Sequence, residues 1–440
     1  MDNKTNQSIV EIIGYTNIGE RIMASAGKIS TQPGDALEIF TNTADELKNT
    51  KLIKKVTSSG HLSVIEHMVF NIAFSNVSVL VEQFMIEFRL ASFTVKSRRY
   101  VDFSNAGYYI PPLRSDDVNP FKAHVDKLFK GYDILTNAGI PKEDARFVLP
   151  YCFNSNFYCT VNGRELVHIL IRMIRSNLPE LIDINRQLVS QIETLAPSIL
   201  SAYDAANGSE KALSLPLSAD NASRKSDKNV ELVSYTQNAT ELLKLSHSIM
   251  LGQDNGNFID AIMESERPRE LEQIYYTFKL NNISLSSITH IVRHRMQSII
   301  VPSITDICPD DYILPETVVE SGLSDVYKAL FDDNRAYIKA LKGKNYDRSV
   351  IGYLALSGNT TSVITTMNAR ELILFLRLRT CNRAQWEIRN FAQEMLFTLR
   401  QIAPEIFNKM GPSCYLNGFC PEGKMTCGKK TQMCEKYSKF

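Results

Sequence analysis

The 440-residue chain lacks an excess of charge of either sign, because 49 Lys and Arg balance 48 Asp and Glu. That balance excludes broad, unspecific binding to nucleic acid, although it allows a local basic pocket. The chain also lacks an apolar run long enough to span a membrane, and its polar start over residues 1–4 does not resemble a signal peptide. These absences predict a cytoplasmic protein with no membrane or nucleic-acid partner.

Cysteine is sparse except near the C-terminus, where four of the eight cysteines gather. The other four are scattered in apolar segments and are expected to be small core residues or free thiols. The C-terminal four lack the Cys-x-x-Cys spacing of zinc knuckles, but four thiolates can hold zinc or an iron–sulfur cluster. The alternatives for this tail are a metal site and a loose reduced segment. The candidate metal ligands are Cys414, Cys420, Cys427 and Cys434.

The chain contains an internal repeat. Residues 230–236 repeat residues 10–16 at a separation of 220, and residues 368–372 repeat residues 162–166 at a separation of 206. A period of this length predicts a tandem duplication and not a solenoid, and duplicated domains tend to dock as a pseudo-symmetric pair. The expected divisions are a first lobe at 1–204, a polar linker at 205–229, a second lobe at 230–405 and a Cys-rich tail at 406–440.

Local patterns predict the main elements. Alternating β-branched and small residues predict a strand over 10–16, and apolar residues dominate a second expected strand over 68–74. Helical spacing of large apolar residues predicts one long helix over 368–399, and Asn368 stands where its N-cap would be.

The two copies differ at one basic motif. The second copy contains Arg293, His294 and Arg295, which suit an anion because Arg offers a fixed fork of donors and His a titratable one. The first copy has lost the first two basic residues, but it retains a Ser-Arg-Arg-Tyr end over 97–100 that the second copy lacks. A basic helix end favoured by the helix dipole would explain either motif alone. Together they look like complementary halves of one site.

These motifs match a known family. The chain resembles the flavin-dependent thymidylate synthases, and each half resembles one family subunit over nearly its whole length. Besides the Arg-His-Arg triplet, the resemblance rests on Gly60 and His61, Glu66 and His67, residues 97–103, 145–150 and 368–372, and the run 384–389.

The resemblance implies an α+β fold with two homologous lobes, each with a twisted, mainly antiparallel sheet and long helices. Family members work as homotetramers with sites between subunits, so two chains of this kind would form a homodimer that mimics a tetramer. The implied reaction is the reductive methylation of dUMP to dTMP with FAD, methylenetetrahydrofolate as carbon donor and NADPH as reductant. Such a methyltransferase has no cysteine nucleophile, so arginines must activate the uracil ring electrostatically.

The resemblance also implies which residues form the site. Arg379 is expected to polarise the uracil ring as the catalytic residue, and Met173 replaces it in the first lobe. The other expected substrate-binding residues are Lys96, Ser97, Arg98, Arg99 and Arg146. The expected cofactor-binding residues are His61, Ser63, Glu66, His168, Arg293, His294, Arg295, Met296, Asn368 and Arg370.

The expected site is divided between the lobes. Thr305 and Gly352 stand in the second lobe where the first has Arg99 and Arg146. Of four pseudo-equivalent sites in a dimer, two would then collect every arginine and two would be dead. The acidic residue of the family motif is replaced by valine in both copies, which leaves two alternatives open. These are a paralogue that binds flavin or nucleotide without turnover, and an enzyme acting on a related pyrimidine nucleotide.

Overall fold

The computed structural model describes residues 7–209, 225–251 and 257–439, which form two compact units. Unit 1 contains the first repeat together with residues 304–306 and 314–357 of the second repeat. Unit 2 contains the rest of the second repeat and the C-terminal tail. No helix in the described ranges is long and apolar enough to cross a membrane.

The predicted division of the chain remains a prediction at its boundaries. Most of the predicted linker, residues 210–224, lies outside the described residues. The lobe predicted at 230–405 contributes elements to both units, because residues 314–357 belong to unit 1.

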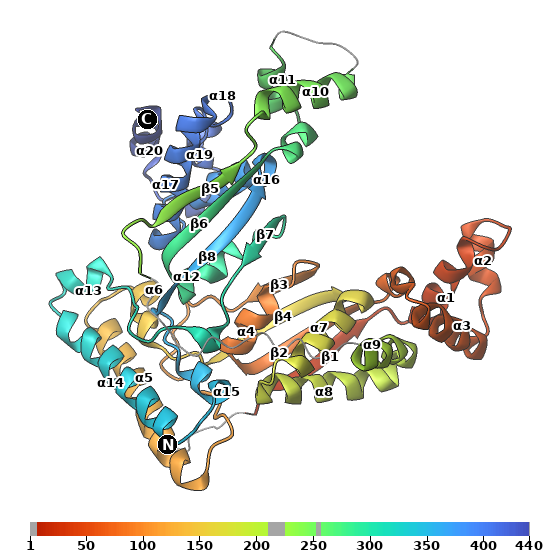
Figure 1. Cartoon of the computed structure of the whole chain (residues 1–440), viewed down its shortest axis with the longest axis horizontal. Helices are drawn as coiled ribbons and strands as arrows, with labels where there is room; N and C mark the ends of the chain where they lie inside the picture. The colour runs from red at the N-terminus through yellow and green to blue at the C-terminus, as the bar shows by residue number, and fades with distance from the viewer. Residues whose placement is uncertain (1–6, 210–224, 252–256, 440) are drawn as a thin grey trace. The chain divides into compact units, whose positions relative to one another are not determined.

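Unit 1 is built on a four-stranded antiparallel sheet in the order β1-β2-β4-β3 (Figure 1). The central strand β2 alternates buried Phe70, Ile72 and Phe74 with more exposed residues, as a strand with one covered face must. Apolar residues of α7 and α8 share one core with this face. The strands are β1 (Ile9–Tyr15), β2 (Val69–Ser78), β3 (Ala91–Val95) and β4 (Asn154–Asn162).

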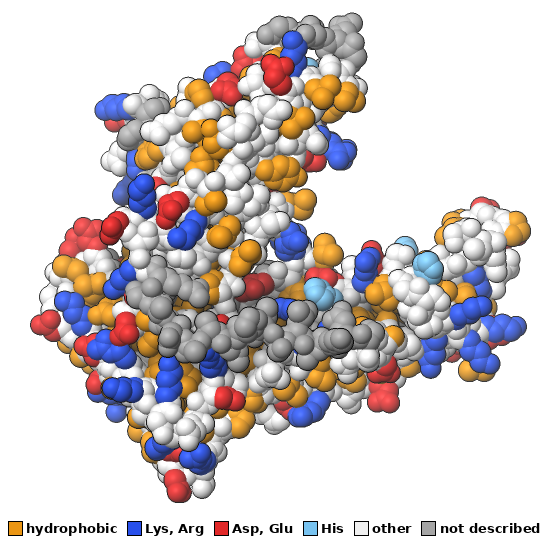
Figure 2. All heavy atoms as spheres, viewed as in Figure 1, with side chains coloured by type: hydrophobic (Ala, Val, Ile, Leu, Met, Phe, Trp, Pro, Cys, Tyr) orange, Lys and Arg blue, Asp and Glu red, His pale blue; other side chains and the backbone are white. Residues whose placement is uncertain are grey.

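The helices of unit 1 come from both repeats. In Figure 2, Lys and Arg side chains gather over the α1–α3 group, where α3 carries four exposed lysines. First-repeat helices are α1 (Gly19–Ile29), α2 (Ala36–Asn42), α3 (Glu46–Ser58), η1 (Leu62–His67), α4 (Val79–Ile86), α5 (Ser115–Asn137), α6 (Lys142–Ala145), η2 (Arg146–Val148), α7 (Gly163–Arg175), α8 (Pro179–Leu195) and α9 (Pro197–Ser209). Those from the second repeat are η4 (Ile304–Asp306), α13 (Glu316–Glu320), α14 (Ser324–Gly343), α15 (Arg348–Ile351) and η5 (Gly352–Leu354).

Unit 2 has the same sheet, in the order β5-β6-β8-β7. Its strands are β5 (Val230–Tyr235), β6 (Tyr275–Ser284), β7 (Gln297–Ile300) and β8 (Thr360–Asn368). Its helices are α10 (Ala239–Leu251), α11 (Phe258–Glu264), η3 (Arg269–Gln273), α12 (Leu285–Ile291), α16 (Ala369–Arg379), α17 (Trp386–Ile402), α18 (Pro404–Phe407), α19 (Ser413–Leu416), η6 (Gly423–Met425) and α20 (Lys430–Ser438). Two such sheets confirm the predicted α+β fold.

The duplication is visible in the backbone. Ser92 pairs with Thr160 in unit 1, and Ser298 pairs with Thr366 in unit 2, at the same separation of 206 along both strands. Each central strand has an irregularity next to an asparagine in the left-handed region, Asn76 or Asn282, both with a φ of 55°. Asparagine tolerates this region better than most residues. The strand register therefore shows the separation of 206 residues that the repeat at 162–166 and 368–372 predicts.

One sequence expectation about the fold is wrong. The helix predicted over 368–399 is two helices, α16 and α17, with a break over residues 380–385. The Thr380 hydroxyl donates to the Leu376 carbonyl at the end of α16, and the Gln385 side chain accepts from the Ile388 N–H as the cap of α17. Apolar spacing continues across the break, so periodicity alone does not reveal it.

Within unit 1, segments of the two repeats pair as equals. The Tyr151 N–H donates to the Ala355 carbonyl at 2.8 Å, and the Ser357 N–H donates to the Leu149 carbonyl at 2.9 Å. The two bonds are equivalent in the repeat, because the donors Tyr151 and Ser357 are counterparts 206 residues apart, and so are the acceptors Leu149 and Ala355. A contact in which residue i meets j and j meets i has two-fold symmetry. The isolated bridge between Pro150 and Leu356 lies at the centre of this pseudo-two-fold pairing.

Helices α5 and α14, which flank this pairing, meet through contacts that are not equal. The rings of His124 and Tyr337 stack at 4.2 Å. The counterpart of that pair is Gly131 against Leu330, where a Cβ on the glycine would lie 2.4 Å from the Leu330 Cδ1. At one contact the rings of His124 and Tyr337 stack, and at the other the Leu330 side chain packs against the backbone of Gly131.

We predict that Gly131→Ala lowers the free energy of unfolding by about 1–3 kcal/mol, because the added methyl overpacks the contact with Leu330. Leu330→Ala removes the atoms that clash, so the double variant should lose less than the sum of the two single variants. Urea unfolding of all four proteins measures this coupling, and strictly additive losses would contradict it.

Unit 1 also buries an ion pair. The Arg98 Nη2 lies 2.7 Å from the Glu82 Oε1, and both residues are at most 5% exposed. The Ser155 hydroxyl donates to the other carboxylate oxygen. The counterparts of Glu82 and Arg98 in the second repeat are Ile288 and Ile304. One repeat therefore has a buried charged pair at positions where the other has two isoleucines.

We expect Arg98→Ile to lower the free energy of unfolding by about 3–5 kcal/mol, because it leaves the Glu82 carboxylate buried without its cation. The double variant Glu82→Ile with Arg98→Ile copies the second repeat and should recover most of that loss. The measurement is the urea midpoint followed by circular dichroism. A double variant no more stable than Arg98→Ile would show that the pair is not the source of the effect.

Candidate functional site

In unit 2 the Arg-His-Arg triplet lies in the short connection between α12 and β7. The side chains of Arg293 and Arg295 are exposed, while His294 between them is 5% exposed. Met296 follows with 70% of its surface exposed. The triplet therefore presents two guanidinium groups and one apolar side chain outward, and it turns its imidazole inward.

His294 contacts two charged side chains of α16. Its Nδ1 lies 3.0 Å from the Glu371 Oε1, and the Arg379 Nε donates to its Nε2 at 3.0 Å. Because the arginine Nε is only a donor, the His294 Nε2 must accept, and the proton of a neutral ring then lies on Nδ1, facing Glu371. Burial lowers the pKa of His294 and the charge of Arg379 lowers it further, while the hydrogen bond to Glu371 opposes both. The ring is accordingly neutral near pH 7.

The start of α16 fixes two further predicted residues. The Asn368 side chain accepts from the Glu371 N–H at 2.9 Å, so it is the N-cap, as its position in the sequence predicts. Arg370 pairs with Glu272 on η3. The first repeat has the same arrangement at α7, where Asn162 accepts from the Glu165 N–H at 2.9 Å and an arginine pairs with Glu66. Both sets therefore have structural partners within their own unit.

In unit 1 the predicted phosphate-binding arginines meet at one residue. The Arg99 Nε lies 2.6 Å from the Glu143 Oε2, and the Arg146 Nε donates to the Glu143 carbonyl at 3.1 Å. The Ser97 hydroxyl accepts from the Arg99 N–H at 3.3 Å, which shapes the loop after β3. The ammonium of Lys96 lies 5.9 Å from the ring centre of Phe103. The structure thus brings Arg99 and Arg146 together, whereas Arg98 points into the core.

The other predicted residues of unit 1 lie on its surface. His61, Ser63 and Glu66 are exposed on and next to η1. The side chain of His168 is 58% exposed on α7, and its ring meets the Phe88 ring edge-on at 5.4 Å. These positions leave all four side chains accessible to a ligand.

In the second repeat, Thr305 and Gly352 stand at the counterparts of Arg99 and Arg146, and they leave little space between them. A Cβ on Gly352 would lie 3.0 Å from the Thr305 Cγ2, which is tighter than ordinary van der Waals contact. The position that holds Arg146 in the first repeat therefore holds no side chain in the second, and its neighbour Thr305 occupies the adjoining space.

Two acidic residues of these sites were missed by sequence reasoning. Glu371 follows its cap by three residues, which is the spacing of a capping box and a usable signal. Glu143 is separated from Arg99 by more than forty residues, and no local pattern in the sequence connects them.

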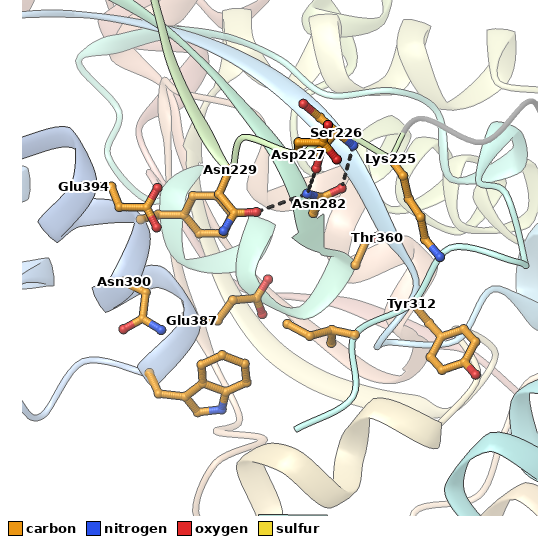
Figure 3. A pocket seen from close by; sticks show the side chains of 13 residues that line it. Lys225, Ser226, Asp227, Asn229, Asn282, Tyr312, Thr360, Glu387, Asn390 and Glu394 are labelled. Atoms are coloured by element: carbon orange, nitrogen blue, oxygen red, sulfur yellow. Dashed lines mark hydrogen bonds between the residues drawn. The ribbon is translucent and has the colours of Figure 1, made fainter. Parts of the chain in front are cut away.

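A cavity of about 470 Å³ in unit 2 lies away from the predicted residues. Figure 3 shows Asn229 and Asn282 joined by a hydrogen bond of 3.0 Å on one side and Glu387 and Asn390 on another. None of the residues predicted as substrate-binding, cofactor-binding or metal-binding lines it. The cavity is therefore no evidence for the predicted site.

The structure does not support the predicted zinc or iron–sulfur site. Within the described ranges no group of three or more His, Cys, Asp or Glu could hold a metal ion. Burial raises the pKa of the Cys414 thiol, and neighbouring thiols, first Cys381, raise it further. The tail cysteines Cys414, Cys420, Cys427 and Cys434 are free thiols.

Known proteins resemble both repeats. The family model described as "Thymidylate synthase complementing protein" matches residues 11–198 and again residues 218–405. A flavin-dependent thymidylate synthase of Clostridium tetani is 33% identical over 236 residues, which cover 46% of this chain and 94% of the relative. One from Geobacter sulfurreducens is 37% identical over 192 residues, covering 40% of this chain and 78% of the relative.

One solved structure also matches half of the chain. It is the crystal structure of a UMP/dUMP methylase from Streptomyces cacaoi bound with 5-Br dUMP, with a TM-score of 0.40 and 24% identity. The match covers 46% of this chain and 96% of that one.

The family model thus covers most of the chain in two consecutive matches, and the strand registers of the two units repeat at the same separation. The chain therefore belongs to the thymidylate synthase complementing protein family, as a tandem duplication in which each repeat corresponds to one family domain.

Proposed function

We propose that the chain is a flavin-dependent thymidylate synthase that converts dUMP to dTMP with methylenetetrahydrofolate and NADPH, using sites built from both repeats. The observation that carries this proposal is that each repeat lacks expected site residues that the other repeat retains. Unit 1 keeps the Arg99 and Arg146 pair and has Met173 in place of the catalytic arginine. The second repeat keeps Arg379 beside His294, but it has Thr305 and Gly352 at the counterparts of the pair. Each repeat retains what the other has lost.

The residues of unit 2 fit a flavin dinucleotide. Exposed Arg293 and Arg295 offer two guanidinium forks of the kind that bind pyrophosphate, and exposed Met296 offers an apolar surface to a ring. FAD, when bound, would supply the hydride that reduces the transferred methylene group. The part of the protein is to hold the uracil ring near the flavin and to place Arg379 where negative charge develops on that ring.

The residues of unit 1 fit the phosphate of the nucleotide. Arg99 is partly exposed and is held at its Nε by the Glu143 carboxylate. Arg146 donates to the backbone carbonyl of the same residue, so both guanidinium groups are held at Glu143. A dianionic phosphate is the kind of ligand that accepts charge-assisted hydrogen bonds from such a pair of arginines.

An exposed apolar surface in unit 2 supports a larger assembly. Met296 and Ile300 near β7 and Leu374 and Leu378 on α16 are between 46% and 70% exposed. Large apolar side chains that are exposed in a subunit are often covered in its assembly. We infer a homodimer with four lobes, in which these residues are covered and the two sets of arginines meet.

We predict that the chain restores growth of a thymidine-requiring strain, and that Arg379→Met abolishes this while flavin stays bound. Removing a positioned charge from the reacting ring should lower turnover at least about 100-fold. Met173→Leu, at the counterpart position in the first repeat, is the matched control and should complement normally. A wild-type chain that is folded and loaded with flavin but does not restore growth would favour a role in binding flavin or nucleotide without turnover.

The hybrid site predicts one flavin per chain. The ratio follows from the absorbance of released FAD divided by the protein concentration. Arg293→Ala with Arg295→Ala should lower the ratio towards zero, because both forks are lost. Arg89→Ala, at the counterpart of Arg295 in the first repeat, should leave it at one. Two flavins per wild-type chain would refute the division of the site between the repeats.

A further inference from the structure

We propose that His294 is a positioning residue for Arg379 and does not bind the flavin. Its Nε2 accepts the Arg379 Nε–H and so fixes the guanidinium plane, and Glu371 fixes the tautomer that makes this possible. The inference rests on the proposed function, since it gives Arg379 the role of activating the pyrimidine ring.

The geometry leaves His294 no donor for a cofactor. A neutral imidazole has one N–H and one acceptor nitrogen. The N–H is directed at the Glu371 Oε1 at 3.0 Å, and the acceptor is directed at the Arg379 Nε at 3.0 Å. The ring is also 5% exposed, between the exposed Arg293 and Arg295. In the outward-facing triplet, the two arginines are therefore the groups that can reach a dinucleotide.

The three partners of His294 lie on one face of α16. Glu371, Phe375 and Arg379 are spaced by four residues, so they are stacked along the helix. The imidazole meets the Phe375 ring edge-on at 5.0 Å, between its contacts with the two charged residues. Glu371 is itself held by the Asn368 cap at the start of the helix. The imidazole of His294 is therefore held by Glu371 in the first turn of α16, and it in turn contacts Arg379, the last residue of that helix.

A neutral partner suits the expected task of Arg379. An arginine held by a carboxylate, as Arg370 is held by Glu272, has its charge largely offset by that contact. The contact of Arg379 with a neutral imidazole orients the guanidinium and leaves its positive charge uncompensated by that partner. Burial and Arg379 both keep the ring neutral, so the arrangement is self-consistent. A guanidinium oriented in this way is suited to face an electron-rich ring or a developing anion.

The first repeat shows that the two residues were lost together. At the counterparts of His294 and Arg379 it has Phe88 and Met173, which keep the bulk and remove both the acceptor and the donor. The counterpart carboxylate, Glu165, lies instead 3.4 Å from the Nδ1 of His168. Phe88 also shows that an aromatic ring without nitrogen is tolerated at this position of the fold.

Two substitutions test the proposal. His294→Phe copies the first repeat and removes the acceptor. His294→Gln should restore it, because the glutamine Oε1 can take the place of the Nε2. We expect His294→Phe to lower kcat at least about 100-fold, with the flavin dissociation constant changed less than threefold, and His294→Gln to recover at least a tenth of the wild-type kcat. Flavin affinity is measured by titration of the apoprotein with FAD.

A second readout does not depend on turnover. In protein with ¹⁵N-labelled arginine, the Arg379 Nε–H resonance, identified by its loss in Arg379→Met, should exchange slowly in the wild type and in His294→Gln and rapidly in His294→Phe. If the wild type proves inactive but this pattern holds, the proposed function fails and the positioning role stands. Full kcat in His294→Phe, or a large loss of flavin affinity with an unchanged Arg379 resonance, would overturn the positioning role.

Discussion

The exchange of backbone hydrogen bonds between residues 149–151 and 355–357 is the constraint on which the rest of unit 1 depends. It joins the chain segments that directly precede β4 and β8, each of which is an inner strand of its sheet. Because equivalent bonds run in both directions, the contact has the pseudo-two-fold symmetry of an isologous dimer interface, although it lies within one chain. Helices α5 and α14 pack beside it and complete the pairing.

The sequence predicted the duplication well, because the two copies keep the same residue separation along their strands. The strands expected at 10–16 and 68–74 correspond to β1 and the first part of β2. The break between α16 and α17 was missed, because the apolar period continues across it and only the cap at Gln385 reveals it. The metal site expected at the tail is not supported, because composition gathers cysteines without saying whether their thiols converge.

The sequence predicts the site as a set of residues, whereas the structure shows which side chain each of them contacts. Three arginines that look alike in sequence differ in what holds them. Arg98 is paired with a buried carboxylate and stabilises the core, whereas Arg99 is paired with a carboxylate at the surface. Arg379 is held by a neutral ring. Burial and partner therefore distinguish the three arginines, and neither can be read from sequence spacing.

The unequal contacts between α5 and α14 specify which helix can pair with which. Two copies of the first helix would set Gly131 against His124 and leave a gap, and two copies of the second would set Leu330 against Tyr337 with too much bulk. The observed pair is a knob fitted to a hole, the device that makes heterodimers reject their own homodimers. At this contact each repeat therefore fits the other repeat better than a second copy of itself.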